Sequence, residues 1–214
     1  MNDSESSNIS MNTSSMNTSR LETLVDGIFA IAMTLLVLSI GVPDISRGLT
    51  EAAFQQQLWI LWPKIMCYVL SFWILAGFWR NNHQQFYFIK RSNPTLITIN
   101  VFWLLLIALM PFSTEIISEY GGSYITANII FQVNLLLAGI IYYFNWHYSV
   151  WKGLTADNMD EDIVKMMKAI NLILPICSVM ALGLSLYVYA WSNLIYLASP
   201  IFKRMIERKY SGKS

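Results

Sequence analysis

Long apolar runs, each about as long as a bilayer-crossing helix, alternate along this chain with short polar stretches. A helix needs roughly 20 mainly apolar residues to cross the hydrocarbon core. The last two runs have no obvious turn between them, so they also fit one long helix. The pattern predicts an all-α membrane protein, a bundle of six transmembrane helices. Its six spans are expected at about residues 21–42, 58–79, 96–112, 124–146, 169–187 and 189–202.

The distribution of basic residues decides between five and six spans. With six spans, Arg47 and Lys64 lie on one side of the membrane and the other twelve of the 14 Lys and Arg lie on the opposite side. Since basic loops stay in the cytoplasm, six spans predict cytoplasmic N and C termini, whereas five would place the basic C-terminus outside. The twelve are Arg20, Arg80, Lys90, Arg91, Lys152, Lys165, Lys168, Lys203, Arg204, Arg208, Lys209 and Lys213.

Composition agrees with a membrane protein, because 55% of the residues are hydrophobic and only 13% are charged. The net charge of +1 gives no reason to expect nucleic acid as a partner. We expect a disordered polar tail over residues 1–19, the six-span domain over 20–204 and a basic cytoplasmic tail over 205–214. Cys67 and Cys177 lie in apolar runs, where cysteine packs as a small hydrophobic residue, so no disulfide is expected.

Motifs of enzymes and metal sites are missing from the sequence. It contains no His-Glu-x-x-His, Gly-x-Ser-x-Gly or Cys-x-x-Cys, and its two histidines are far apart. It also has no Thr-Val-Gly-Tyr-Gly-like segment, the re-entrant loop that forms a carbonyl filter in many potassium channels. We therefore expect no enzyme, no cofactor, no bound metal and no re-entrant selectivity-filter loop.

Ile31, Leu35 and Leu38 fall on one narrow stripe of the first predicted helix. At 100° per residue, Leu35 lies about 40° and Leu38 about 20° from Ile31, and Thr34 flanks the stripe at about 60°. Asp26 lies about 140° away, so its carboxylate faces a different neighbour. Such a stripe is typical of helix packing, of lipid contact or of a pore lining, and periodicity alone does not separate the three.

The stretch RLETLVDGIFAIAMTLLVLSI, residues 20–40, resembles the signature first helix of the transmembrane protein 175 family, the lysosomal and prokaryotic potassium channels. Arg20, Asp26 and the run FAIAMTLLVL match the family pattern, whereas Leu24 and Val25 replace its Phe and Ser. The segments FWRNNHQQF and NVFWLLLIALMPF, at the end of the second span and in the third, support the resemblance.

The resemblance implies a homotetramer in which one first helix from each subunit lines a pore through the bilayer. Ile31, Leu35 and Leu38 would then form stacked hydrophobic rings, and Thr34 would add a hydroxyl layer that contributes to potassium preference. An aliphatic ring gives a cation no ligands, so it blocks when narrow and passes a hydrated ion when wide. The expected function is a potassium-permeable channel whose hydrophobic rings act as gate and filter, with K⁺ as the permeant ion.

The resemblance also implies a polar network that holds the first helix against the second and third. Asp26 is its expected centre, with Trp79, His83 and Asn100 at the positions of its partners. The stripe geometry agrees, because it turns Asp26 away from Ile31. Arg20 falls on the side of the stripe, so it either joins this network or rings the cytoplasmic mouth.

Two other functions fit the same residues. One is a proton-coupled secondary transporter of a small cation or solute, with Asp26 and His83 as a proton relay. The other is a structural membrane subunit without flux. A prokaryotic plasma membrane is the expected location, because the chain carries one six-span unit whereas animal relatives of the family carry two.

Overall fold

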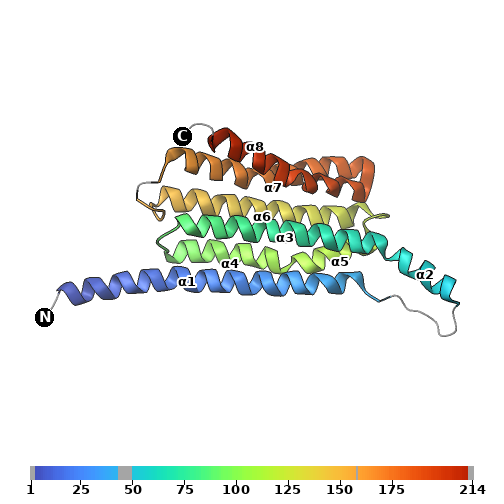
Figure 1. Ribbon diagram of the computed structural model, residues 1–214, viewed down its shortest axis with the longest axis horizontal. Helices are drawn as coiled ribbons and strands as arrows, with labels where there is room; N and C mark the ends of the chain where they lie inside the picture. Colours follow the sequence, from blue (N-terminus) through green and yellow to red (C-terminus); the bar gives the residue numbers. More distant parts are fainter. Residues whose placement is uncertain (1–2, 43–49, 158, 212–214) are drawn as a thin grey trace.

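The computed structural model describes residues 3–42, 50–157 and 159–211 (Figure 1). Arg47 and Lys213, which belong to the charge pattern above, lie outside these residues. Nearly all of the described chain is helical, so the all-α prediction is confirmed. The elements are α1 (Asp3–Leu35), the 3-10 helix η1 (Leu36–Ile40), α2 (Glu51–Ile60), α3 (Trp62–Phe88), α4 (Pro94–Ala108), α5 (Met110–Tyr120), α6 (Ile125–Trp151), α7 (Glu161–Val188), the 3-10 helix η2 (Tyr189–Ala198) and α8 (Ser199–Ser211).

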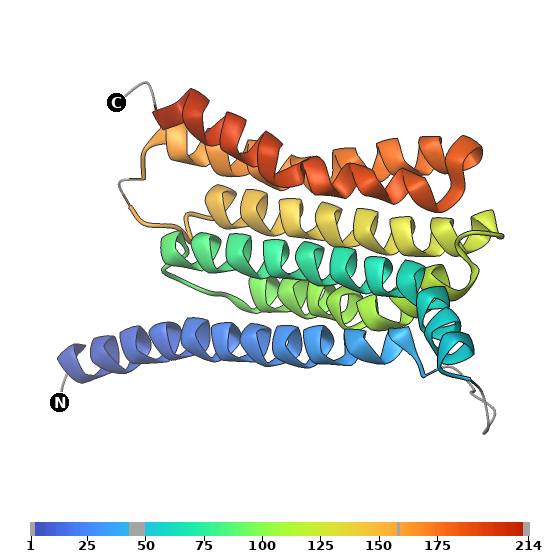
Figure 2. The same ribbon diagram turned by 45° about the vertical axis from the view of Figure 1, so that its right-hand side comes forward.

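Five helical segments among the described residues are long and apolar enough to cross a membrane. The last segment, η2 followed by α8, runs back along α7 (Figure 2). Its second half carries Lys203, Arg204, Arg208 and Lys209, so only its first half is apolar, and the sixth span stays a prediction. The five are Thr18–Ile40, Glu51–Phe88, Pro94–Tyr120, Ile125–Trp151 and Glu161–Val188.

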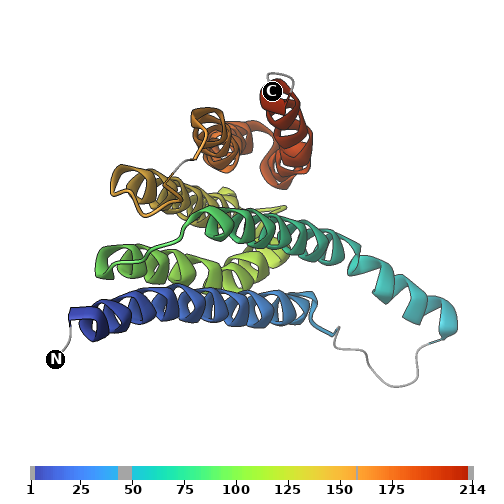
Figure 3. The same ribbon diagram turned by 60° about the vertical axis from the view of Figure 1, so that its left-hand side comes forward.

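The helices lie side by side in layers. Figures 1 and 3 show α1 on one face, α7 and α8 on the opposite face, and α3 to α6 between them. Both chain termini lie at the same end of the bundle as the α3–α4 and α6–α7 connections (Figure 1). The basic residues of these connections, among them Lys90, Arg91 and Lys152, are therefore gathered at one end of the molecule.

Several helix boundaries differ from those expected, among them the end of α3 at Phe88 and the start of α7 at Glu161. Helix α1 extends back to Asp3, whereas the sequence favours a disordered tail up to Ser19; that tail contains no Gly or Pro that would stop a helix. The third segment breaks at Leu109 and continues to Tyr120 instead of ending near residue 112. Pro111 starts the second half, because a proline without an N–H fits the first turn of a helix.

Four aromatic rings form the centre of the core. The ring centroids of Phe29 and Trp103 are 5.4 Å apart, those of Phe78 and Trp103 5.9 Å, and those of Trp103 and Tyr142 5.0 Å. Each of the four side chains is at most 1% exposed. Because they come from α1, α3, α4 and α6, this cluster fixes the inner side of α1 against the rest of the bundle.

Candidate functional site

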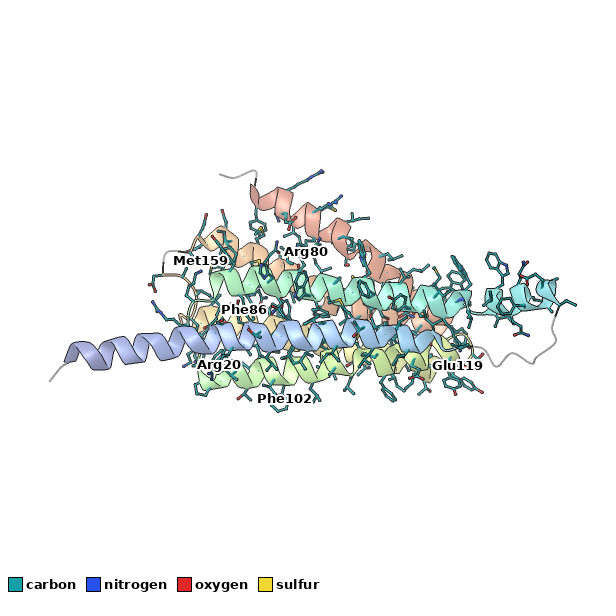
Figure 4. The ribbon with its side chains drawn as sticks, turned by 60° about the horizontal axis from the view of Figure 1, so that its bottom comes forward. Arg20, Arg80, Phe86, Phe102, Glu119 and Met159 are labelled. Carbon is teal, nitrogen blue, oxygen red and sulfur yellow. The ribbon has the colours of Figure 1, made fainter. Side chains whose placement is uncertain are left out.

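The outer face of α1 and η1 is aliphatic and uncovered in the protomer. Leu24 is 46% exposed, Ile31 57%, Leu35 44% and Leu38 68%, although all four are apolar. Figure 4 looks onto this side of the molecule, with α1 in front. The exposed positions coincide with the stripe derived from helical periodicity. The structure therefore places this stripe on the surface of the protomer.

The opposite face of the same helix is tightly packed. Val25, Phe29, Ala32 and Leu36 are at most 2% exposed and belong to the hydrophobic core. They recur at spacings of three and four residues, which places them on one side of a helix. One side of α1 is thus fixed by the protomer while the other remains free to meet a second surface.

At Leu36 the helix changes from α to 3-10 geometry. Side chains three residues apart eclipse each other in a 3-10 helix, so Leu35 and Leu38 stand one above the other. Ser39 Oγ donates a hydrogen bond to Leu36 O at 2.7 Å, and Ser118 Oγ on α5 donates one to Ser39 O at 3.3 Å. These two bonds stabilise the narrow turn and attach it to the neighbouring helix.

Thr34 lies on the exposed side of α1. Its Oγ1 lies 2.9 Å from Ala30 O and 2.8 Å from Ile31 O, so the hydroxyl donates its proton to its own helix. A hydroxyl oxygen keeps acceptor lone pairs after its proton is used. The oxygen of Thr34 is therefore available to a positively charged group at the exposed face.

Asp26 and Trp79 join α1 to α3. Trp79 Nε1 donates a hydrogen bond to Asp26 Oδ1 at 2.9 Å. The ring of His83, one turn further along α3, stacks on Trp79 with centroids 6.2 Å apart and an interplanar angle of 25°. Three of the expected network residues thus form one continuous group at the edge of the α1–α3 contact.

Asn100 and Arg20 are placed elsewhere. Asn100 is fully buried, donates from Nδ2 to Leu96 O at 2.8 Å, and accepts from Asn145 Nδ2 on α6 at 2.9 Å. Its hydrogen bonds therefore tie α4 to α6 instead of holding Asp26. Arg20, labelled in Figure 4, is exposed on α1.

The sequence analysis did not single out Asn145, because its hydrogen-bond partner, Asn100, lies on another helix. An asparagine in an apolar run indicates an interhelical hydrogen bond, but the run does not say which helix supplies the other group.

Among the described residues, no group of three or more His, Cys, Asp or Glu lies close enough together to hold a metal ion.

Comparison with known proteins shows which family the part of the chain with this exposed α1 face resembles. Residues 20–111, which contain the exposed stripe, Asp26, Trp79 and Asn100, match the family described as endosomal/lysosomal potassium channel TMEM175. Over these residues, somewhat less than half of its length, the chain is similar to the TMEM175 family. The resemblance noted in the first helix is confirmed by this match.

Three curated relatives of this chain are each named a potassium channel. The protein from Streptomyces collinus is 35% identical over 134 residues, which cover 60% of this chain and 63% of the relative. The protein from Chamaesiphon minutus is 35% identical over 103 residues, 48% of this chain and 50% of the relative. The protein from a Chryseobacterium species is 32% identical over 129 residues, which cover 59% of this chain and 62% of the relative. The alignments span between half and just under two thirds of these relatives.

Two solved structures share the fold. The crystal structure of a lysosomal potassium-selective channel TMEM175 homologue from Chamaesiphon minutus superposes with a TM-score of 0.75 at 24% identity, covering 89% of this chain and 98% of that one. A variant of the potassium channel MtTMEM175, solved with a nanobody fusion protein, superposes with a TM-score of 0.54 at 18% identity, covering 91% and 94%. The arrangement of helices is therefore that of TMEM175 proteins over most of the chain.

Proposed function

We propose that this protein is a potassium-permeable channel, a homotetramer in which α1 and η1 of each subunit line the pore. The observation that carries the proposal is the contrast between the two faces of this helix. Its inner face is sealed into the core, and its outer face presents Ile31, Leu35 and Leu38 to a surface outside the protomer. The family match over residues 20–111 and the potassium-channel relatives support it.

The proposed gate consists of stacked aliphatic rings. Four copies of Ile31, Leu35 or Leu38 around an axis offer no oxygen or nitrogen ligand to a cation. A narrow ring therefore excludes water and blocks conduction, whereas a wider ring passes a hydrated or partly hydrated ion. Because Leu35 and Leu38 are aligned by the 3-10 turn, a change in η1 would alter two successive rings together.

Thr34 is the proposed polar layer between these rings. Its hydroxyl proton is held by Ala30 and Ile31 carbonyls, so the oxygen faces outward as an acceptor. Four such oxygens favour a cation over an anion and contribute to the choice among cations. Since they are weak single dipoles rather than a full set of ligands, the expected preference for potassium over sodium is modest.

The same proposal includes the setting of the channel. Six crossings would place both termini and the basic connections in the cytoplasm. The bacterial sources of the relatives support a prokaryotic plasma membrane. Asp26, Trp79 and His83 would hold the pore helix against α3, and Arg20 would lie near the cytoplasmic mouth.

Bilayer recording of the Ile31→Asn variant tests the pore assignment. A polar amide in a hydrophobic ring lowers the cost of hydration, so we expect higher resting conductance and a changed potassium-to-sodium permeability ratio. The matched control is Ile176→Asn on α7, because Ile176 is 54% exposed on the opposite face of the bundle and Ile31 57%. The control is expected to conduct like the unmodified protein.

Equal conductance and selectivity of the Ile31→Asn variant and the unmodified protein would contradict the pore assignment. Saturable flux that is coupled to protons and lost in Asp26→Asn would instead establish the transporter. Absence of any cation flux from reconstituted protein of verified fold would leave the structural subunit.

A further inference from the structure

Two adjoining cavities lie between α3, α7 and α8, on the side of the bundle away from the α1 face. Their volumes are about 240 Å³ and 360 Å³. The two cavities are neighbours, because four residues line both: Trp73, Arg80, Pro200 and Lys203. Figure 4 labels Arg80, which lies between α3 and α8.

The inner cavity contains polar groups without partners. Asn171 on α7 lines it and is 3% exposed, yet neither its amide nitrogen nor its amide oxygen has a hydrogen-bond partner among the described residues. Tyr142 on α6, also lining the cavity, is 1% exposed and its hydroxyl is likewise unpaired in this part of the chain. Buried polar groups nearly always have hydrogen-bond partners, so the unpaired amide of Asn171 and hydroxyl of Tyr142 indicate a place for a ligand or water.

Two basic side chains, those of Arg80 and Lys203, line both cavities. Lys203 is only 7% exposed, and its Nζ donates to Asn81 Oδ1 at 2.6 Å and Gln84 Oε1 at 3.0 Å. Its ion-pair partner, Glu207, is 3.8 Å away. Burial, followed by repulsion from Arg80, lowers the pKa of the Lys203 ammonium. The lining of the outer cavity carries three basic side chains, those of Arg80, Lys203 and Arg204, against the one carboxylate of Glu207, and this net positive charge favours an anion there.

We propose that this space is a binding site for a phosphate group, held by Arg80 and Lys203 and by the amide of Asn171. A phosphate has several acceptor oxygens and is matched by guanidinium, ammonium and amide donors together. Basic pockets between transmembrane helices take phospholipid headgroups, and the basic end of the bundle lies alongside. Trp73 and Ile201 at the rim give an acyl chain an apolar surface. The chemistry is shared by an anionic phospholipid and by free phosphate.

Binding of dioctanoyl phosphatidylglycerol to the full-length protein in detergent, measured by native mass spectrometry, tests the site. Arg80→Gln and Asn171→Leu are each expected to weaken lipid binding roughly tenfold, because each removes a donor to the phosphate. Lys209→Gln is the matched control, since it also removes a basic residue of α8 but one that does not line either cavity. It is expected to leave binding unchanged.

A parallel arm replaces the lipid with inorganic phosphate. Displacement of the lipid by millimolar phosphate, lost in Arg80→Gln, identifies free phosphate as a sufficient ligand, whereas binding of the lipid alone identifies the headgroup in the membrane. Asn171→Leu removes a buried unpaired amide, so its melting temperature is expected to stay equal or rise while lipid binding falls. Arg80 is exposed, which keeps Arg80→Gln informative if Asn171→Leu fails to fold.

Equal lipid binding by the unmodified protein, Arg80→Gln and Asn171→Leu would overturn the proposal. An equal loss in Lys209→Gln would overturn it as well, because the attraction would then belong to the basic surface of α8 in general. None of these measurements uses ion flux, so their failure is distinguishable from failure of the channel proposal.

Discussion

At the scale of single residues, the hydroxyl of Thr34 has one donor and two acceptor positions, and the structure uses the donor within α1. This geometry gives the hydroxyl two distinct roles, as a donor within the helix and as an acceptor toward the exposed face, which the sequence alone does not distinguish. The hydrogen bond to the helix fixes the hydroxyl proton, and the outward oxygen is the part that a cation would meet in the proposed pore.

Substitution of Thr34 by Val and by Ser separates these roles. Val keeps the shape but has no oxygen, so we expect the potassium-to-sodium permeability ratio to fall toward one. Ser keeps the oxygen and is expected to retain most of the ratio. Reversal potentials under bi-ionic conditions measure both, and an unchanged ratio in Thr34→Val would show that the hydroxyl has no part in selectivity.

The hydrogen bond between Trp79 and Asp26 links α3 to α1 at the residue scale. Trp79→Phe keeps an aromatic ring and removes the donor, leaving the carboxylate oxygen of Asp26 without this partner. Because the pair is partly exposed, we expect a loss of only about 1 kcal/mol in the free energy of unfolding. A double-mutant cycle with Asp26→Ala, which removes the acceptor, followed by thermal unfolding in detergent, measures the coupling. Additive effects of the two substitutions would contradict a direct link.

At the scale of helices, hydrophobic length predicts where the apolar runs lie but not where each helix begins or ends, since α3 continues to Phe88 and α7 begins at Glu161. Asn93 and Asp160 cap α4 and α7 as such residues commonly do. The break at Leu109 was not predictable in the same way. Asn134 on α6 donates to Leu106 O at 3.3 Å and to Ser113 Oγ at 3.2 Å across this break, and no local pattern shows that distant partner.

The α6–α7 contact depends on one glycine. A Cβ on Gly139 would lie 2.8 Å from Pro175 Cδ and 2.9 Å from Pro175 Cγ, closer than such atoms approach. Pro175 is held within α7, so Gly139→Ala would push the two helices apart. We expect the free energy of unfolding to fall by about 1–3 kcal/mol.

Gly183→Ala on α7 is the control for this prediction. A Cβ there meets nothing within 4 Å, and alanine is the better helix former, so equal or slightly higher stability is expected. Thermal unfolding of the three proteins in the same detergent decides the matter. Equal melting temperatures for Gly139→Ala and Gly183→Ala would show that α6 and α7 do not rely on this close approach.

At the scale of the whole molecule, the alignment of Ile31, Leu35 and Leu38 on one stripe was predictable from helical periodicity, whereas its exposure on the protomer surface was not. The grouping of Asp26, Trp79 and His83 came from the family resemblance, and the structure brings those three together. Asn100 bonds to Asn145 instead, because the rotation of α4 in the bundle, which no local pattern determines, turns it toward α6. The cavity around Asn171 also requires three helices distant in sequence.

The last segment determines whether the chain crosses the membrane five or six times. The helix ends at Val188, and Tyr189 takes a positive φ of 48°, which turns η2 and α8 back along α7. The basic residues of α8 then lie at the same end of the bundle as the other basic connections, and that gathering favours six crossings under the positive-inside rule.

Reporter fusions test the number of crossings. Alkaline phosphatase is active only outside the cytoplasm and green fluorescent protein fluoresces inside it. We expect phosphatase activity from a fusion after Val188 and fluorescence from a fusion after Ser211, with a fusion after Lys152 as the cytoplasmic reference. Phosphatase activity from the fusion after Ser211 would mean five crossings. It would also place four basic residues of α8 outside, against the charge asymmetry of the remaining connections.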